Sequence, residues 1–410
     1  MNKTMEAALL LSSLSVYRGV LKRTVTGAYY RLLCAYDKPA GEFLRAWGEF
    51  FALLCDRNYA DNLLCCLTEA ALFDENAFSR AATAGQEHTL PKEVMDAVLR
   101  DLSAVTKAGE LTPEEILDGY PHRDELGAVI NTLPRWKNGS PAKELSDITA
   151  LAGYYRKNGC GMFARYKAFL WQNGDIEPVV HPDSVKLSSL KAYEIPRNIV
   201  VQNTVSFLKG SQANNCLLYG DMGTGKSTTV KAVVNEYSNQ GLRIVEIPKD
   251  RLGEFSQLAE RIAAVPMKFI IFIDDLSFSG EDKSYAQLKA VLEGGIAARP
   301  QNSLIYATSN RRHLIKESFA DREGDEIHRN DTIQETLSLS DRFGLSVNFS
   351  RPGKEEYLTI VHSLAKEREL HIEPEVLERE AEKWAIQKGG RSPRCAKQFI
   401  AMLETELSTD

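Results

Sequence analysis

The strongest chemical signal in the sequence is the segment of residues 220–227, which reads Gly-Asp-Met-Gly-Thr-Gly-Lys-Ser. It has the form G-x-x-x-x-G-K-[ST], which is typical of a loop that binds phosphate groups. The three glycines let backbone N–H groups point at phosphate oxygens without a Cβ in the way. Lys226 is predicted to reach the β- and γ-phosphates, and the Ser227 hydroxyl to ligate Mg²⁺. The residues predicted to surround the phosphates are Gly220, Asp221, Met222, Gly223, Thr224, Gly225, Lys226, Ser227 and Thr228.

The residues on either side of this loop support the interpretation. Residues 215–219 are apolar enough for a short buried strand, and residues 228–237 have the spacing of an amphipathic helix that Gly241 closes. A helix would therefore begin directly under the phosphates, where its N-terminal N–H groups and dipole favour an anion. The sequence predicts a nucleotide-binding site.

A second acidic motif follows the apolar residues 269–273, where the chain continues with Asp274 and Asp275. A carboxylate at the end of a buried strand can hold Mg²⁺ or its water shell, and we assign this role to Asp274. A helix N-cap is the alternative role for this residue. Asp275 is the candidate for activating the attacking water. It is one methylene shorter than the glutamate usual at such a position, which predicts slow turnover.

Further polar residues follow later strands. Asn310 comes after the apolar residues 304–307, and an amide there can contact the γ-phosphate or the attacking water. Arg342 precedes the last predicted strand, residues 345–349, and Arg391 and Arg394 follow in a helical C-terminal segment. A single arginine is usually a surface residue. Together, these residues have the layout of an oligomeric ATPase in which arginines stabilise the charge of the transition state.

These motifs together resemble the AAA+ superfamily of ATPases. The resemblance is closer to the bacterial predicted ATPases catalogued as domain of unknown function eight hundred and fifteen, and it covers the chain from about residue 154 to the C-terminus. The segments that carry it include Asp274-Asp275-Leu276-Ser277-Phe278, Tyr306-Ala307-Thr308-Ser309-Asn310-Arg311-Arg312-His313-Leu314 and Leu339-Ser340-Asp341-Arg342-Phe343-Gly344-Leu345.

The resemblance implies roles for individual residues. Asn310 matches the sensor-1 position. Arg342 matches the arginine finger, with Arg329 as the alternative. Arg391 matches sensor 2, with Arg394 as the alternative. One more residue concerns the adenine base of the nucleotide. Tyr193 falls where many AAA+ proteins contact adenine, and a packing role is the alternative.

The family also implies an α/β fold. Its core is a parallel sheet of the additional-strand (ASCE) P-loop type with helices on both faces, followed by a helical lid. The resemblance further implies ATP rather than GTP, and assembly into a ring or filament. We expect a helical N-terminal domain over residues 1–185 with a linker near 171–185, an AAA+ nucleotide-binding domain over 186–350 and a lid over 351–410.

Composition limits the other possibilities. The 410 residues are 43% hydrophobic and 26% charged, as in ordinary globular proteins, and the net charge of −6 gives no general attraction to nucleic acid. The seven cysteines form no C-x-x-C pair, which fits reduced thiols. No apolar run reaches membrane-spanning length. The apolar residues near the start are predicted to form an amphipathic helix rather than a signal peptide. We therefore expect a cytoplasmic protein.

The leading functional hypothesis is a self-assembling switch or remodelling ATPase that binds Mg-ATP at subunit interfaces and recruits a protein partner through its N-terminal helices. A nucleic-acid-dependent ATPase of the initiator or helicase-loader kind is an alternative that the acidic balance disfavours. A nucleotide-gated scaffold that does not hydrolyse ATP is another. A threading unfoldase is disfavoured, because residues 248–255 contain no aromatic-aliphatic-glycine pore loop.

Overall fold

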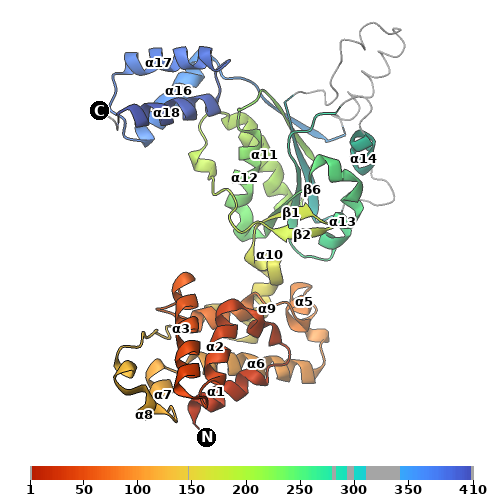
Figure 1. The fold of residues 1–410 in the computed structure, drawn as a ribbon. Helices are drawn as coiled ribbons and strands as arrows, with labels where there is room; N and C mark the ends of the chain where they lie inside the picture. Colours follow the sequence, from red (N-terminus) through yellow and green to blue (C-terminus); the bar gives the residue numbers. More distant parts are fainter. Residues whose placement is uncertain (1, 146, 279–282, 293–299, 311–341, 408–410) are drawn as a thin grey trace. The chain divides into compact units, whose positions relative to one another are not determined.

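The computed structural model describes residues 2–145, 147–278, 283–292, 300–310 and 342–407. The chain divides into two compact units, Met1–Arg165 and Tyr166–Asp410 (Figure 1). Each has its own hydrophobic core, and we describe each by itself. Within the described ranges, no helix is both long and apolar enough to cross a membrane.

Unit 1 is built from helices around an aromatic core. Trp136 lies at its centre, with ring centroids 4.8 Å from Trp47 and 4.9 Å from Phe50. Asp101 is fully buried and its carboxylate accepts the backbone N–H groups of three successive residues that follow the first helix, at 2.7–3.1 Å. The helices are α1 Lys3–Ser12, α2 Thr24–Cys34, α3 Ala40–Asp56, α4 Leu63–Leu72, α5 Ala77–Thr83, α6 Lys92–Gly109, α7 Pro113–Asp118, α8 Arg123–Leu126, α9 Ile148–Asn158 and α10 Gly161–Arg165.

Unit 2 contains a seven-stranded sheet in the order β2-β1-β4-β5-β6-β3-β7. All strand pairs are parallel except the β1–β2 hairpin. The strands are β1 Ala168–Gln172, β2 Asp175–Pro178, β3 Cys216–Gly220, β4 Leu242–Glu246, β5 Lys268–Ile273, β6 Ser303–Ser309 and β7 Leu345–Phe349. Strand β6 separates β3, which leads into the glycine loop, from β5, which leads into the acidic pair. This is the additional-strand arrangement that the sequence resemblance implies.

The hairpin corrects one expectation. Residues 171–185 were expected to be a linker that follows an all-helical segment, but β1 and β2 are part of the sheet and the boundary between the units falls at residue 165. The hairpin is held by packing and by pairing with β4. Trp171 is almost fully buried, and its indole N–H donates to Glu254 at 2.7 Å. Such a short strand is stabilised by partners distant in sequence rather than by its own residues.

Helices cover both faces of this sheet. Figure 1 shows α11 Glu194–Leu208 and α12 Lys226–Tyr237 on one side, with α13 Phe255–Ala263 and α14 Lys283–Leu292 on the other. Strand β5 is apolar on both faces, as expected for a parallel strand buried between two helical layers. The C-terminal helices α16 Lys354–Glu367, α17 Pro374–Gln387 and α18 Pro393–Leu407 form a small bundle with its own core, the expected lid.

Candidate functional site

The register of the sheet brings the predicted motifs together. In β6, Ala307 pairs with the last residue of β5, and Ser309 pairs with Tyr219 of β3. The glycine loop, the acidic pair and Asn310 therefore all follow neighbouring strand ends at the same edge of the sheet. This edge, at the carboxyl ends of parallel strands, is where α/β proteins bind their ligands.

The loop between β3 and α12 has a backbone that its glycines make possible. Gly220, Gly223 and Gly225 have φ values of 132°, 78° and 90°, which residues with a Cβ rarely adopt. A Cβ on Gly220 would lie only 2.2 Å from the carbonyl oxygen of Phe349 in β7. A side chain there would push apart the loop and the strand that supports it. Met222 lies at the loop's tip with 65% of its surface exposed.

Lys226 starts α12 and turns back under the loop. Its Nζ donates to the carbonyl oxygens of Gly220 and Asp221 at 2.8 and 2.7 Å, and to Asn310 Oδ1 at 3.3 Å. Burial lowers the pKa of this ammonium group, and nearby carboxylates oppose the shift. These carboxylates belong to Asp221, Asp275 and Asp274. The ammonium group of Lys226, held by carbonyls of the loop, therefore lies where the sequence motif predicts the phosphates to bind.

The predicted metal ligands are in contact. Ser227 Oγ donates to Asp274 Oδ1 at 2.6 Å, although the two residues lie on different elements, α12 and the end of β5. A hydroxyl beside a carboxylate oxygen is a donor set that suits Mg²⁺, which prefers hard oxygen ligands and keeps several waters. The residues present therefore fit the ion: Ser227 and Asp274 would hold it, directly or through its waters.

Asp275 is the second residue after β5, and its side chain is exposed. Its backbone is left-handed, with φ of 52°, a conformation that Asp tolerates better than most residues. Asn310 Nδ2 donates to Asp275 Oδ1 at 2.8 Å, so that the Asn310 amide bridges the Asp275 carboxylate and Lys226. The predicted activating carboxylate and the predicted sensor thus form one hydrogen-bonded unit.

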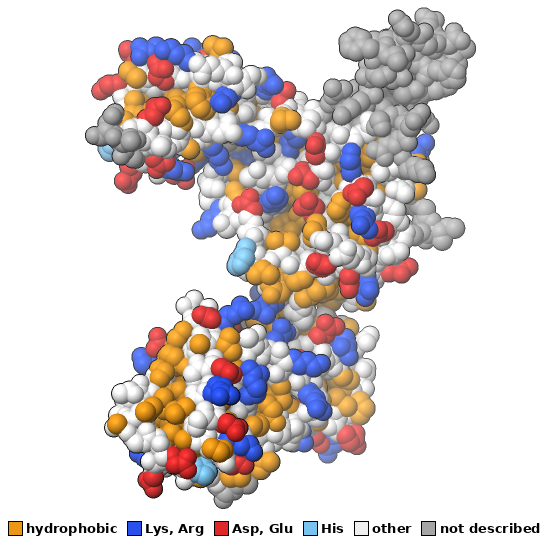
Figure 2. Space-filling model, in the orientation of Figure 1, with side chains coloured by type: hydrophobic (Ala, Val, Ile, Leu, Met, Phe, Trp, Pro, Cys, Tyr) orange, Lys and Arg blue, Asp and Glu red, His pale blue; other side chains and the backbone are white. Residues whose placement is uncertain are grey.

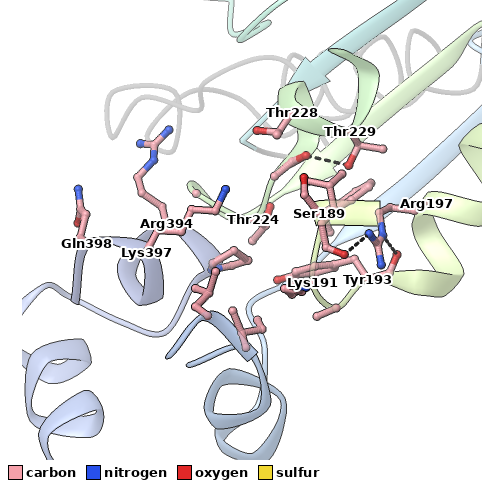
Figure 3. Close-up of a pocket in the computed structure, with 18 residues that line it drawn as sticks. Ser189, Lys191, Tyr193, Arg197, Thr224, Thr228, Thr229, Arg394, Lys397 and Gln398 are labelled. Atoms are coloured by element: carbon pink, nitrogen blue, oxygen red, sulfur yellow. Dashed lines mark hydrogen bonds between the residues drawn. The ribbon is translucent and has the colours of Figure 1, made fainter. Parts of the chain in front are cut away.

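A cavity of about 240 Å³ lies beside the glycine loop (Figure 3). Residues 189–192, which precede α11, line it together with residues of the lid. Tyr193 lines it from the N-terminus of α11. The Tyr193 ring stacks on Phe349 with centroids 5.5 Å apart, and its hydroxyl donates to the carbonyl of Ser350. Thr224, Gly225 and Thr228 also line this cavity. Tyr193 therefore has both a packing contact and a place in the cavity wall.

The lid places Arg394 rather than Arg391 at this cavity. Figure 3 shows Arg394 and Lys397 on the first turns of α18, on the side of the cavity opposite Tyr193. The Arg394 amide also donates to the Gly223 carbonyl at 3.3 Å. Arg391 precedes α18 and makes a two-pronged ion pair with Glu382 of α17 at 2.9 and 2.6 Å, outside the cavity lining.

Arg351 provides a second tie between the lid and the loop. Its backbone N–H and its Nε both reach the Asp221 carboxylate, at 3.0 and 3.3 Å. Its Nη1 donates to the carbonyl of Gly389 at the end of α17, at 3.0 Å. The predicted arginine finger, Arg342, lies half-buried ahead of β7 and is not among the residues that line the cavity. Its alternative, Arg329, lies outside the described residues.

Sequence reasoning missed several residues of the site. Lys397 follows Arg394 by three residues, a spacing that would place both on one helix face once the start of α18 at Pro393 is known. Arg197 lines the cavity too, with its guanidinium bound to backbone carbonyls near the start of α11. Thr308 contacts Asp274, but threonine in an apolar strand gives no signal of its own.

Comparison with solved structures finds similar folds at low identity. The RuvB Holliday junction branch migration motor of Thermotoga maritima matches at 15% identity and a TM-score of 0.38, covering 55% of this chain and 65% of that one. AMPPCP-bound DnaA from Aquifex aeolicus matches at 17% identity and a TM-score of 0.39, covering 54% and 65%. The chain thus spans just under two thirds of these structures.

No curated protein matches the chain. The strand order and the glycine loop identify the fold of unit 2 as a P-loop nucleotide-binding fold of the AAA+ type. A family model, described as "Protein of unknown function (DUF815)", matches residues 164–407, which is more than half of the sequence and nearly all of unit 2. The chain belongs to this family.

Proposed function

We propose that this protein binds Mg-ATP and hydrolyses it slowly at interfaces between its own subunits, acting as an assembly or protein-remodelling switch. The observation that carries the proposal is the contact of Ser227 with Asp274 directly beside the buried Lys226 amine. A hydroxyl, a carboxylate and an ammonium group lie together where backbone N–H groups of the loop can receive a phosphate. Bound Mg²⁺ would neutralise phosphate charge at this point.

The chain's own residues divide the remaining work. Lys226 would exchange its loop carbonyls for phosphate oxygens, and Arg394 would approach the phosphates from the lid. Asp275 would accept a proton from the attacking water, with Asn310 holding its carboxylate in place. The shorter reach of Asp compared with Glu supports slow hydrolysis, which suits a switch better than a motor.

Equilibrium binding of a fluorescent ATP analogue tests the nucleotide site. Lys226→Ala should weaken Mg-ATP binding by at least about tenfold, because hydrogen bonds from a charged donor are among the stronger ones. Lys231→Ala is the matched control, since Lys231 lies on the same helix but outside the loop. Equal binding by wild type and Lys226→Ala would refute the proposal. Radiolabelled ATP then separates a slow ATPase from a scaffold that binds without hydrolysis.

The helical unit 1 is proposed to recruit a protein partner. On the face drawn in Figure 2, acidic and basic side chains are interspersed over the described surface of both units. The net charge of −6 gives no general attraction to nucleic acid, so we favour a protein partner. Stimulation of the ATPase by DNA with a steep salt dependence would reverse this preference.

A further inference from the structure

Thr308 is a buried residue of β6 that holds the turn after β5. Only 2% of its surface is exposed, and three of its hydrogen bonds go to three consecutive residues. Its hydroxyl donates to Asp274 Oδ1 at 2.5 Å and accepts the N–H of Asp275 at 2.9 Å. Its carbonyl accepts the N–H of Leu276 at 2.7 Å. We call this set of contacts the Thr308 clamp.

The clamp accounts for an unusual backbone. Asp275 has φ of 52°, in the left-handed region that is uncommon for residues with a Cβ, although Asp enters it more readily than most. The clamp binds the amides of both Asp275 and the residue after it. Ser309, the next residue in β6, adds a bond from its hydroxyl to the Leu276 carbonyl at 2.7 Å. The direction of the Asp275 side chain is thus set from the neighbouring strand.

The clamp also orients the predicted metal carboxylate. The hydroxyls of Ser227 and Thr308 both donate to the same oxygen of Asp274, Oδ1. When the Ser227 hydroxyl turns to a metal ion, the Thr308 hydroxyl is the donor that remains to fix the carboxylate. Carboxylates that hold a metal are commonly oriented by such outer partners, whose loss lowers metal affinity.

We propose that Thr308 is a positioning residue that orients Asp274 toward Mg²⁺ and Asp275 toward the attacking water. The inference rests on the proposed function. The sequence motifs attribute the binding of Mg²⁺ and the activation of water to Asp274 and Asp275 alone. In this proposal, the Thr308 hydroxyl supports both carboxylates in these roles. Removing this hydroxyl should therefore impair the response to Mg²⁺ and the hydrolysis step, while leaving the glycine loop's contacts with phosphate in place.

The test compares nucleotide binding in EDTA and in Mg²⁺ for the full chain. In Thr308→Val, the affinity gained on adding Mg²⁺ should fall by about tenfold, the effect typical of losing one outer-shell partner of a metal ligand. Binding in EDTA should stay close to wild type. Thr308→Ser keeps the hydroxyl and should recover most of the gain. The ATPase rate measured at increasing Mg²⁺ concentration should show the same order, with Thr308→Ser close to wild type and Thr308→Val needing more Mg²⁺.

Controls separate a structural effect from the proposed one. Thr204→Val removes another fully buried hydroxyl, bonded to Val200 and Tyr306, and should lower the Tm while keeping the full Mg²⁺ response. If Thr308→Val does not fold, Thr308→Ala against Thr308→Ser gives the same comparison. An unchanged Mg²⁺ response in the valine or alanine variant overturns this inference alone. A wild-type protein that gains no affinity from Mg²⁺ overturns the proposed function and this inference with it.

Discussion

At the scale of single residues, the site is a set of charges held by backbone and hydroxyl groups. Lys226 is buried against loop carbonyls, and burial lowers the pKa of its amine while three nearby carboxylates raise it. Asp275 lies 2.8 Å from the Asn310 amide. Nucleotide binding would therefore require Lys226 and Ser227 to exchange these protein contacts for phosphate and metal, while the Asp275–Asn310 contact could stay in place.

The role of Asp275 leads to a prediction about rate. Asp275→Asn keeps the hydrogen-bonding shape of the side chain but removes its basicity, and general bases contribute about 10²–10⁴-fold to catalysis. We expect ATP binding to be retained and hydrolysis, measured as phosphate release, to fall about 100-fold or more. Asp250→Asn, an exposed carboxylate in the turn after β4, is the control. Wild-type turnover of many per second, or an unaffected Asp275→Asn variant, would contradict this role.

At the scale of elements, two arginines of the lid donate hydrogen bonds to the glycine loop. The Arg394 amide reaches the Gly223 carbonyl, and Arg351 joins the Asp221 carboxylate to the end of α17. A Cβ on Gly223 would lie 3.1 Å from both Arg394 and Ser392, so the two elements are closely packed. A movement of the loop on nucleotide binding would therefore displace the start of α18, which contacts it.

The position of α18 predicts which arginine responds to ATP. Arg394→Ala should weaken ATP binding by about tenfold, since it removes a charged donor from the cavity wall. Arg391→Ala should change ATP affinity much less, because its guanidinium is engaged by Glu382. It should instead lower the Tm slightly, as partly exposed ion pairs contribute little to stability. Titrating both variants with ATP compares their affinities. A larger loss of affinity in Arg391→Ala than in Arg394→Ala would restore Arg391 as the sensor.

The same elements show what the sequence could and could not predict. The loop and the acidic pair were predictable because each motif is short and its chemistry depends on adjacent residues. The β1–β2 hairpin was not, because its strands are stabilised by pairing with β4, far along the chain. The choice between Arg391 and Arg394 depended on where α18 begins, and helix boundaries are poorly defined by sequence alone.

At the scale of the whole molecule, the two predicted arginine roles fall in different places. Arg394 of the lid lines the cavity, whereas Arg342 does not. Arg342 precedes β7, which forms an edge of the sheet, and it does not line the cavity of its own chain. A residue that serves a neighbouring subunit has no need to reach its own nucleotide. If the proposed subunit interfaces are head-to-tail, as in rings and filaments, each would pair one subunit's Asp275 with the next subunit's Arg342.

Mixing two inactive variants tests this pairing. Arg342→Ala should bind ATP normally and lose hydrolysis, since a transferred arginine contributes about 10³–10⁵ in rate. Asp275→Asn retains Arg342 but lacks the base. In an equal random mixture, roughly a quarter of the interfaces join an intact Asp275 to an intact Arg342. Phosphate release should therefore return to a corresponding fraction of the wild-type rate, and only under conditions where size measurements show ATP-dependent oligomers. If the mixture stays inactive while it assembles, or if a wild-type monomer hydrolyses ATP at the full rate, Arg342 does not act across subunits.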